Sequence, residues 1–373
     1  MDLTSGVRPL SAAVTAAARL VPSAPLRLSG DADGLEIVAA DRDLCARLAC
    51  PAMVHTNGEV LVPAAPLAET MKMLDTDLVR LVVEGNRLAV RVDGARFALP
   101  VLDPGARVEP TRPPRLSEVD GRVLAAAVRT VAGTAAKDDP LPLFTGVRVQ
   151  AVGGQLVLTA SDRYRMAVAR VPLRTAPGSP DAPSARATVG EVAVPVGPLD
   201  VLVPARLLAE ATRQLAGPVA LHADVARFAL GWRGGSVTTA VLDAGFLSAD
   251  TIPCDAVDTE VTVPADTLAA AVRRVGVYAE DRRVLTLQVG DSHVRLASSR
   301  ADTGEAEETV KATITGGRTS PSFQARYLLD ALAPFGGATV RLSIQPGLRA
   351  CVVRAEDEQE VDLTYLLMPM LPR

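Results

Sequence analysis

Aromatic residues and cysteines are scarce in this sequence of 373 residues. Aromatics make up 3% of the chain while all hydrophobic residues make up 48%, so its cores must be packed mainly with Ala, Val and Leu. The four cysteines, Cys45, Cys50, Cys254 and Cys351, form no C-x-x-C pair. We interpret them as buried free thiols in a reducing cytoplasm. The three histidines are isolated from one another, which predicts no metal site.

Long hydrophobic runs are also missing. No stretch reaches the roughly 18 apolar residues that a membrane-spanning helix needs, so we predict no membrane span. The N-terminus carries Asp2 and has no charged start before an apolar core, which is untypical of a signal peptide. These absences together lead us to expect a cytoplasmic protein.

One helical segment occurs three times. Val60–Leu74 (VLVPAAPLAETMKML) returns at Val201–Leu215 (VLVPARLLAEATRQL) and, more loosely, at Ser322–Phe335 (SFQARYLLDALAPF). In each copy a short extended run leads into a helix whose apolar residues are spaced by three and four. Chance could explain two similar segments, but it does not easily explain a matching context around all three.

A second helix precedes the first in every copy, at Val7–Leu20, Gly121–Val131 and Asp266–Val275. Strands follow each of these opening helices, and a hairpin follows each closing helix. The order helix, strands, helix, hairpin therefore recurs at a period of about 120 to 140 residues, which indicates repeated domains rather than a solenoid. We predict three domains, at residues 1–115, 116–253 and 254–373.

Charge is distributed unevenly along the chain. The net charge is −4, but the repeated helices and their ends carry eleven Lys or Arg residues and five Asp or Glu residues, which leaves −10 for the remainder. Asp120 and Asp266 are expected to cap helix N-termini. The excess of cations fits ordinary solvated helix faces, and it equally fits one shared basic surface opposite an acidic sheet surface.

The sequence close to residue 373 is unusually apolar. Val361–Met370 (VDLTYLLMPM) is predicted to be a strand, and Pro369 should stop its hydrogen-bond ladder. Met368 and Met370 are therefore expected at the surface beside the strand end. Exposed methionines are adaptable and suit a site that binds several partners.

Four motifs carry a resemblance to a known family. They are Phe97–Asp103 (FALPVLD), Leu143–Val149 (LFTGVRV), Leu158–Val168 (LTASDRYRMAV) and Tyr365–Met370 (YLLMPM). With the threefold repeat, they make the whole chain resemble the bacterial DNA polymerase III beta subunit, the replicative sliding clamp. The resemblance implies an α+β fold of three clamp domains, each with two helices and two antiparallel sheets. It also implies a head-to-tail homodimer that encircles double-stranded DNA without reading its sequence, and no cofactor.

The resemblance further implies one pocket per chain for short peptides of DNA polymerase, clamp-loader and repair proteins. Arg165 would orient a peptide acid or carbonyl there. Carried over residue by residue, the pocket would use Phe144, Ser161, Arg163, Tyr164, Arg165, Met166, Leu247, Ile252, Ala350, Leu366, Leu367, Met368, Pro369 and Met370.

Two further surfaces follow from the ring. The side chains expected to face DNA are Lys72, Arg122, Arg129, Arg206, Arg213, Arg273 and Arg274. Ring closure would place Phe97 and Leu99 of one chain against the helix near Val277 of the other. We hypothesise that Arg96 pairs across this interface with Glu305 or Glu307.

Other functions compete with a replicative clamp. Arg163–Tyr164 stands where the family usually has Gly-His, which also fits a diverged paralogue with specialised clients in repair synthesis or in resistance to a clamp-binding antibiotic. A ring-shaped scaffold that is never loaded on DNA is a third interpretation. An enzyme built on Asp162–Arg165 is disfavoured, because the sequence has no nucleophile–base pair, metal set or glycine-rich phosphate loop, and Asp162 is better explained as the tether of a turn.

Overall fold

The structure is a computed structural model of the whole chain. It describes residues 1–103, 105, 109–174, 199–246, 254, 256–279, 284–299 and 304–371, and the backbone alone of 185–189, 192–196 and 300. The chain divides into two compact units, Met1–Ala125 with Leu173–Leu242, and Ala126–Pro172 with Asp243–Arg373. None of the helices in the described part of the chain is long and apolar enough to cross a membrane.

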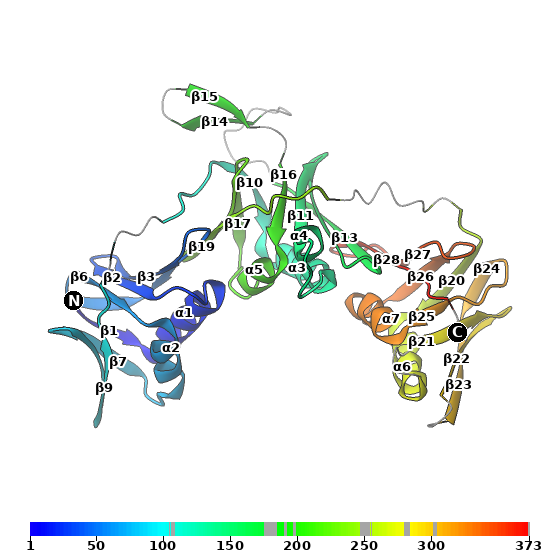
Figure 1. Cartoon of the computed structure of the whole chain (residues 1–373), viewed down its shortest axis with the longest axis horizontal. Coiled ribbons are helices and arrows are strands. Elements are labelled where there is room, and N and C mark those ends of the chain that lie inside the picture. The colour runs from blue at the N-terminus through cyan, green and yellow to red at the C-terminus, as the bar shows by residue number, and fades with distance from the viewer. Residues whose placement is uncertain are drawn as a thin grey trace. The chain divides into compact units, whose positions relative to one another are not determined.

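The first repeat has two helices and nine strands (Figure 1). In chain order they are β1 (Asp2–Gly6), α1 (Val7–Leu20), β2 (Leu26–Asp31), β3 (Gly34–Ala40), β4 (Leu44–Cys50), β5 (Ala52–Thr56), β6 (Gly58–Val62), α2 (Ala64–Met73), β7 (Leu78–Glu84), β8 (Arg87–Val92) and β9 (Ala95–Pro100). The opening helix α1 has the predicted bounds.

The second repeat follows the same order with insertions. It comprises β10 (Arg115–Asp120), α3 (Gly121–Thr134), α4 (Pro142–Thr145), β11 (Gly146–Val152), β12 (Gln155–Ser161), β13 (Arg165–Pro172), β14 (Ala185–Val189), β15 (Val192–Val196), β16 (Asp200–Pro204), α5 (Ala205–Ala211), β17 (Pro218–Ala223), β18 (Arg227–Trp232) and β19 (Gly235–Ala240). The added hairpin β14–β15 pairs only with itself in the described part of the chain.

The third repeat completes the series. Its elements are β20 (Thr259–Pro264), α6 (Ala265–Val275), η2 (Gly276–Tyr278), β21 (Val284–Val289), β22 (His293–Arg300), β23 (Gly304–Lys311), β24 (Thr313–Gly316), β25 (Ser322–Gln324), α7 (Ala325–Leu332), η3 (Ala333–Phe335), β26 (Thr339–Ile344), β27 (Cys351–Ala355) and β28 (Asp362–Leu367). The predicted α+β fold with a repeated order of helices and antiparallel sheets is confirmed.

Strand pairing joins neighbouring repeats within each unit, and the pairs that join them are antiparallel. In the first unit an eight-stranded sheet runs β10-β17-β18-β19-β4-β3-β2-β6, so β19 of the second repeat pairs with β4 of the first. In the second unit the order β11-β12-β13-β28-β27-β26-β20-β24 pairs β13 of the second repeat with β28 of the third. We call these two pairings the first joint and the second joint.

Both joints have the same register. Val237 lies opposite Ala46 in the first joint, and Tyr365 lies opposite Ala167 in the second. Val237 and Tyr365 are equivalent, because each pairs with the matching position of the preceding strand, Leu230 or Val353. The joint is thus a repeated structural unit of backbone hydrogen bonds between equivalent edges.

The core is aliphatic, as the composition predicts. α1 buries an apolar stripe that includes Leu10, Val14 and Ala17, and it packs against α2 and α5 in the first unit (Figure 1). In the second unit α6 packs against α7, where Leu328 and Leu332 are fully or almost fully buried. Each buried aliphatic side chain of this size contributes about 1.5–3 kcal/mol relative to an exposed one.

The two expected helix caps have different outcomes. Asp120 caps α3, because its carboxylate accepts the N–H groups of Arg122 and Val123 at 2.9 and 3.2 Å. Asp266 does not cap α6, whose N-cap residue is Pro264. It lies in the first turn and accepts the N–H of Gly337 at 2.9 Å, so it ties the helix to the segment that follows η3.

The two glycines of α3 give a matched stability test. A Cβ on Gly121 would lie 2.7 Å from the carbonyl oxygen of Gly217, whereas a Cβ on Gly133 would meet nothing within 4 Å. We expect Gly121→Ala to destabilise the protein by about 1–3 kcal/mol, because backbone must move. Gly133→Ala should be neutral or stabilising by up to about 1 kcal/mol. Thermal unfolding measures both, and equal melting temperatures would contradict the close approach at Gly121.

Candidate functional site

The candidate site is built on the turn between β12 and β13. The carboxylate of Asp162 accepts the N–H groups of Tyr164 and Arg165 at 3.2 and 3.1 Å, and the Asp162 N–H donates to the Arg165 carbonyl. Ser161 donates its hydroxyl to the same carbonyl at 2.9 Å. This is the self-bonded turn that an aspartate favours, and the expectation that Asp162 tethers a turn is confirmed.

Arg165 is buried and holds the site together. Its Nε donates to Asp162 Oδ2 at 2.8 Å and its Nη1 to Asp330 Oδ2 at 2.5 Å, while the Tyr365 hydroxyl lies 3.3 Å from Nη1. Burial opposes the charge, but Tyr365, Asp162 and Asp330 outweigh it and raise the pKa of Arg165. The side chain is 4% exposed. Its Nε, Nη1 and Nη2 groups all have partners within the chain, and the expectation that Arg165 orients a peptide stays a prediction.

Two residues of α7 that the sequence did not mark complete this cluster. Tyr327 stacks on Tyr164 with ring centroids 5.9 Å apart, and the guanidinium of Arg165 lies 4.7 Å from the Tyr327 ring centroid. Burial raises the pKa of Tyr327. Asp330 stands one helical turn further on. The only sign of these two residues in the sequence is that Tyr327 and Asp330 form a polar pair three positions apart in an apolar helix. Such a pair also fits a solvated helix face.

An apolar cluster lies beside the turn. Met166, Val168, Ala350 and Leu366 are buried together, and partly buried side chains that pack against them include that of Phe246. The N–H of Met368 donates to the Tyr164 carbonyl at 2.9 Å, and the N–H of Met370 donates to Ser322 at 2.7 Å. Met368 is exposed as expected, whereas Met370 is half-buried.

The predicted pocket residues are brought together to different extents. Hydrogen bonds within one turn hold Ser161, Arg163, Tyr164 and Arg165 together. Phe144 lies under the Arg163 guanidinium. Leu367 lies opposite Arg165 across the second joint and is fully buried, and Pro369 is half-buried. Leu247 and Ile252 lie outside the described residues.

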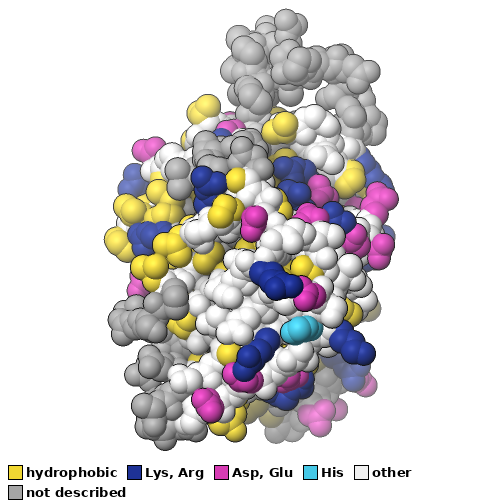
Figure 2. Space-filling model, turned by 90° about the vertical axis from the view of Figure 1, so that its right-hand side faces the viewer, with side chains coloured by type: hydrophobic (Ala, Val, Ile, Leu, Met, Phe, Trp, Pro, Cys, Tyr) yellow, Lys and Arg dark blue, Asp and Glu magenta, His cyan; other side chains and the backbone are white. Residues whose placement is uncertain are grey.

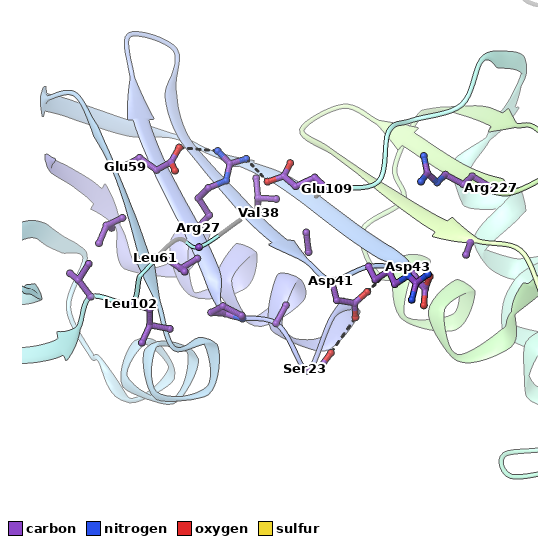
Figure 3. A pocket seen from close by; sticks show the side chains of 18 of the residues that line it. Ser23, Arg27, Val38, Asp41, Asp43, Glu59, Leu61, Leu102, Glu109 and Arg227 are labelled. Carbon is purple, nitrogen blue, oxygen red and sulfur yellow. Dashed lines mark hydrogen bonds and ion pairs between the residues drawn. The ribbon is translucent and has the colours of Figure 1, made fainter. Parts of the chain in front are cut away.

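A cavity of about 1210 Å³ occupies the equivalent place at the first joint (Figure 3). There the apolar and aromatic residues are replaced, as follows from the registers: Ser23 stands for Phe144, Arg227 for Ala350 and Ala240 for Met368.

Ion pairs and a hydrogen bond also connect residues that line the first-joint cavity. Arg27 pairs with Glu59 and with Glu109, each at 3.0 Å, and Ser23 donates to Asp41 (Figure 3). The second joint, with its aromatic and thioether side chains, is therefore the better match for an apolar peptide.

The seven side chains expected to face DNA are all exposed. Lys72, Arg213 and Arg274 form ion pairs with Glu69, Glu210 and Glu308. Within the described residues no ion pair is made by Arg129, Arg206 or Arg273. These helices thus present cations to solvent, although Lys72, Arg213 and Arg274 share their charge with a neighbouring carboxylate.

The sheet surface is mixed rather than uniformly acidic where it can be followed. Arg341 pairs with Glu356, and Arg295 pairs with Glu307. Figure 2 shows Lys and Arg side chains interspersed with Asp and Glu on the face in view. Many sheet carboxylates are thus neutralised locally by arginines of the same sheets.

The residues expected at the ring interface lie on two edge strands and beside them. β9 ends the five-stranded sheet β5-β1-β7-β8-β9, and β23 ends the four-stranded sheet β23-β22-β21-β25. Phe97 on β9 is 41% exposed and Leu99 is 8% exposed, while Val277 beside β23 is 73% exposed. Arg96 pairs with Glu84 at 2.6 Å within the chain, and Glu305 is exposed.

Family models match all three repeats. They are those of the DNA polymerase III beta subunit, with its N-terminal domain at residues 19–106, its central domain at 118–183 and its C-terminal domain at 251–371. A beta sliding clamp of Streptomyces coelicolor is 28% identical over 97% of this chain and 96% of its own. The beta sliding clamp homolog GriR of Streptomyces muensis is 26% identical over 94% of this chain and 92% of its own.

Solved structures share the fold over the full length. The DNA polymerase III beta subunit of Thermotoga maritima has a TM-score of 0.87 at 19% identity, with 100% of both chains covered. A sliding clamp of Pseudomonas aeruginosa bound to griselimycin has a TM-score of 0.85 at 21% identity, again with 100% of both chains covered.

The buried arginine gives a test of how the site is held. Replacing Arg165 by Met should lower stability by about 3–5 kcal/mol, because the largely buried carboxylate of Asp162 then has no cation. Arg129→Met is the matched control, since Arg129 is exposed and forms no ion pair with a described residue. Thermal unfolding compares the two variants, and a wild-type melting temperature for Arg165→Met would show that the cluster does not stabilise the site.

Proposed function

The chain belongs to the DNA polymerase III beta subunit family, the bacterial sliding clamps, and we propose that it closes into a ring around duplex DNA and tethers DNA polymerase and repair proteins by short peptides. This is a binding role without catalysis. The observation that carries it is the pair of equivalent joints between repeats, which leaves one matching pair of edges, β9 and β23, for a second copy.

Transferring the register of the two joints predicts how the third would pair. Phe97 is equivalent to Val237 and Tyr365, and Ala306 is equivalent to Ala46 and Ala167. Phe97 of one chain would then lie opposite Ala306 of the other. One step along the antiparallel ladder, Arg96 would lie opposite Glu307. Two steps in the other direction, Leu99 would lie opposite Gly304.

Burial supports this pairing. Val237 and Tyr365, the partners of Ala46 and Ala167 in the two joints, are 3% and 1% exposed, whereas Phe97 is 41% exposed. A third joint would bury Phe97 as the other two bury their counterparts. A long unpaired edge with an exposed aromatic ring otherwise invites aggregation.

Charge supports the same pairing. Arg96 pairs with Glu84 and Glu307 pairs with Arg295 within the free chain. Both are exposed surface pairs of small net value, so the two residues can exchange partners at little cost when the edges meet. Arg96 facing Glu307 then selects the antiparallel register.

The exposed arginines of the helices supply the DNA contacts of the proposed ring. Contacts to phosphates carry no sequence information, and they need only be weak because a closed ring holds DNA by topology. We assign this role to Lys72, Arg122, Arg129, Arg206, Arg213, Arg273 and Arg274. The domain limits 1–115, 116–253 and 254–373 are part of the same proposal, with two chains giving six domains around the DNA.

The peptide-binding role is assigned to the second joint. Phe144, Met166, Leu366 and Met368 supply apolar area beside the Arg165 cluster. The similarity to the Streptomyces muensis homolog GriR supports a second candidate, a diverged paralogue whose clients differ from those of the replicative clamp. Arg163 in place of the usual glycine fits that candidate too.

Topological retention tests the ring. A clamp loaded by a clamp loader onto nicked circular DNA should stay bound through gel filtration in high salt. It should be lost when the circle is linearised, because it slides off the ends. Equal retention on circular and linear DNA would contradict encirclement, and no retention on either would favour the unloaded scaffold.

Interface variants test the third joint. Phe97→Asp should weaken dimerisation by about 10²- to 10⁴-fold, because each of the two joints of the ring loses about 1.5–3 kcal/mol of apolar burial. Val225→Asp is the control, because Val225 is 97% exposed on a turn distant from both edges in sequence. Sedimentation equilibrium measures the dissociation constants.

Charge exchange tests the register in the same assay. Arg96→Glu and Glu307→Arg should each weaken the dimer, and the double variant should restore much of the loss. Strictly additive losses would contradict the pairing of these two residues, and a rescue by Glu305→Arg in place of Glu307→Arg would shift the register.

A further inference from the structure

Arg163 covers the aromatic wall of the candidate pocket. Its guanidinium carbon lies 4.3 Å from the centroid of the Phe144 ring. Its two terminal nitrogens reach the carboxylate of Asp139 at 2.8 and 3.0 Å. Phe144 is only 8% exposed in this arrangement, while the Arg163 side chain is 45% exposed. An apolar peptide side chain would have to displace this guanidinium to stack on Phe144.

The backbone of Arg163 is strained. Its φ is +78°, and no other non-glycine residue in the described part of the chain has a positive φ. This region costs free energy for a residue with a Cβ.

The hydrogen bonds to the aspartate of the turn do not require that conformation. Asp41 and Asp224 form the same bonds, accepting the N–H groups two and three residues ahead, and the residues equivalent to Arg163 are Arg42 and Val225. Neither of these has a positive φ.

The positive φ of Arg163 is therefore maintained by contacts that the other two turns lack, which are those of its side chain and the hydrogen bond from its N–H to Ser161 Oγ at 3.2 Å. The Asp139 carboxylate is 10% exposed, so its ion pair with Arg163 is worth more than a fully exposed pair. The Phe144 ring adds a cation–π contact. These two contacts hold Arg163 over Phe144, and loss of either one favours relaxation of the backbone.

We propose that Arg163 is a gate over Phe144 that also sets the specificity of the pocket for acidic peptides. The proposal rests on the peptide-binding function assigned above. The gate is closed in the free protein, and the apolar anchor of a peptide opens it by taking the place of the guanidinium on the Phe144 ring. The displaced guanidinium, which has lost the Asp139 carboxylate, then pairs with a carboxylate of the peptide beside its anchor.

The rest of the turn can stay in place while the gate opens. The Tyr164 carbonyl accepts the N–H of Met368, and the Tyr164 ring stacks on Tyr327. Arg165 is anchored by its buried ion pairs. Opening therefore involves the Arg163 side chain and its own φ, which makes it a local two-state change.

The test uses the full-length protein and two labelled synthetic hexapeptides. Both carry Leu and Phe anchors, and they differ only in Asp or Asn beside the Phe. Fluorescence anisotropy gives their dissociation constants. We expect the wild type to prefer the Asp peptide by about two- to fivefold, the range of a partly exposed ion pair. Arg163→Ala and Arg163→Gly should remove this preference and should bind the Asn peptide more tightly than the wild type does.

Two further variants separate the gate from the charge. Asp139→Asn removes the ion pair that holds Arg163 but leaves its guanidinium present. This variant should therefore bind both peptides more tightly than the wild type and retain the preference for Asp. Arg42→Ala, the equivalent residue at the first joint, should leave both constants unchanged. Arg163→Gly should also melt at a higher temperature than Arg163→Ala, because glycine adopts the positive φ without strain.

The outcomes distinguish the gate from the peptide-binding function on which it rests. A wild-type Asp preference that persists in Arg163→Ala would overturn the gate and leave peptide binding intact. Unchanged affinity for the Asn peptide in Asp139→Asn would overturn gating by the ion pair. If no variant binds either peptide, the pocket and the gate both fail, whereas retention on circular DNA would still report a working ring.

Discussion

Backbone hydrogen bonding across strand edges is the constraint on which the rest of the structure depends. Each repeat presents one edge equivalent to β4 and one equivalent to β19, and an unpaired edge in a sheet is a liability. Two of the pairings are made within the chain, in one register, with an alanine facing a larger side chain each time. The bonds come from the backbone, so the side chains at the joint were free to diverge. That freedom explains a cavity bordered by ion pairs at the first joint and an aromatic site at the second.

The second joint is fixed by a buried cation instead of by hydrophobic packing alone. Arg165 draws Asp162 from the turn, Asp330 from α7 and the Tyr365 hydroxyl from β28 to one point. Removing Arg165 would leave the largely buried carboxylate of Asp162 without a cation in a low-dielectric setting, so the elements are placed by a network centred on one guanidinium. At the first joint Leu44 stands in the position of Arg165, and the ion pairs near that joint are made by Arg27 and Arg47 with Glu36, Glu59 and Glu109 instead.

Much of this was predictable from local signals, and the failures have physical causes. The bounds of α1 follow from its apolar periodicity, and the role of Asp162 follows from the turn chemistry of aspartate. Tyr327 and Asp330 were missed because a tyrosine and an aspartate three apart look like a solvated helix face until β13 and β28 are placed beside α7. The burial of Arg165 was missed for the same reason, since charge pairing over 165 residues of sequence leaves no periodic trace. The positive φ of Arg163 could not be predicted from the sequence, because the usual sequence sign of a positive φ is a glycine and this position holds an arginine.

The open edges β9 and β23 determine where the proposed ring would open. The first and second joints close between segments of one chain, so their effective concentration is set by the tether and does not change on dilution. A third joint between two chains would have the same backbone bonds but no tether, and its occupancy would fall with protein concentration. A ring of two such chains would have six nearly identical joints, and it would therefore always open at one of the two that join different chains. The entry point for a strand of DNA would be decided by chain connectivity and not by any special weakness in the contacts.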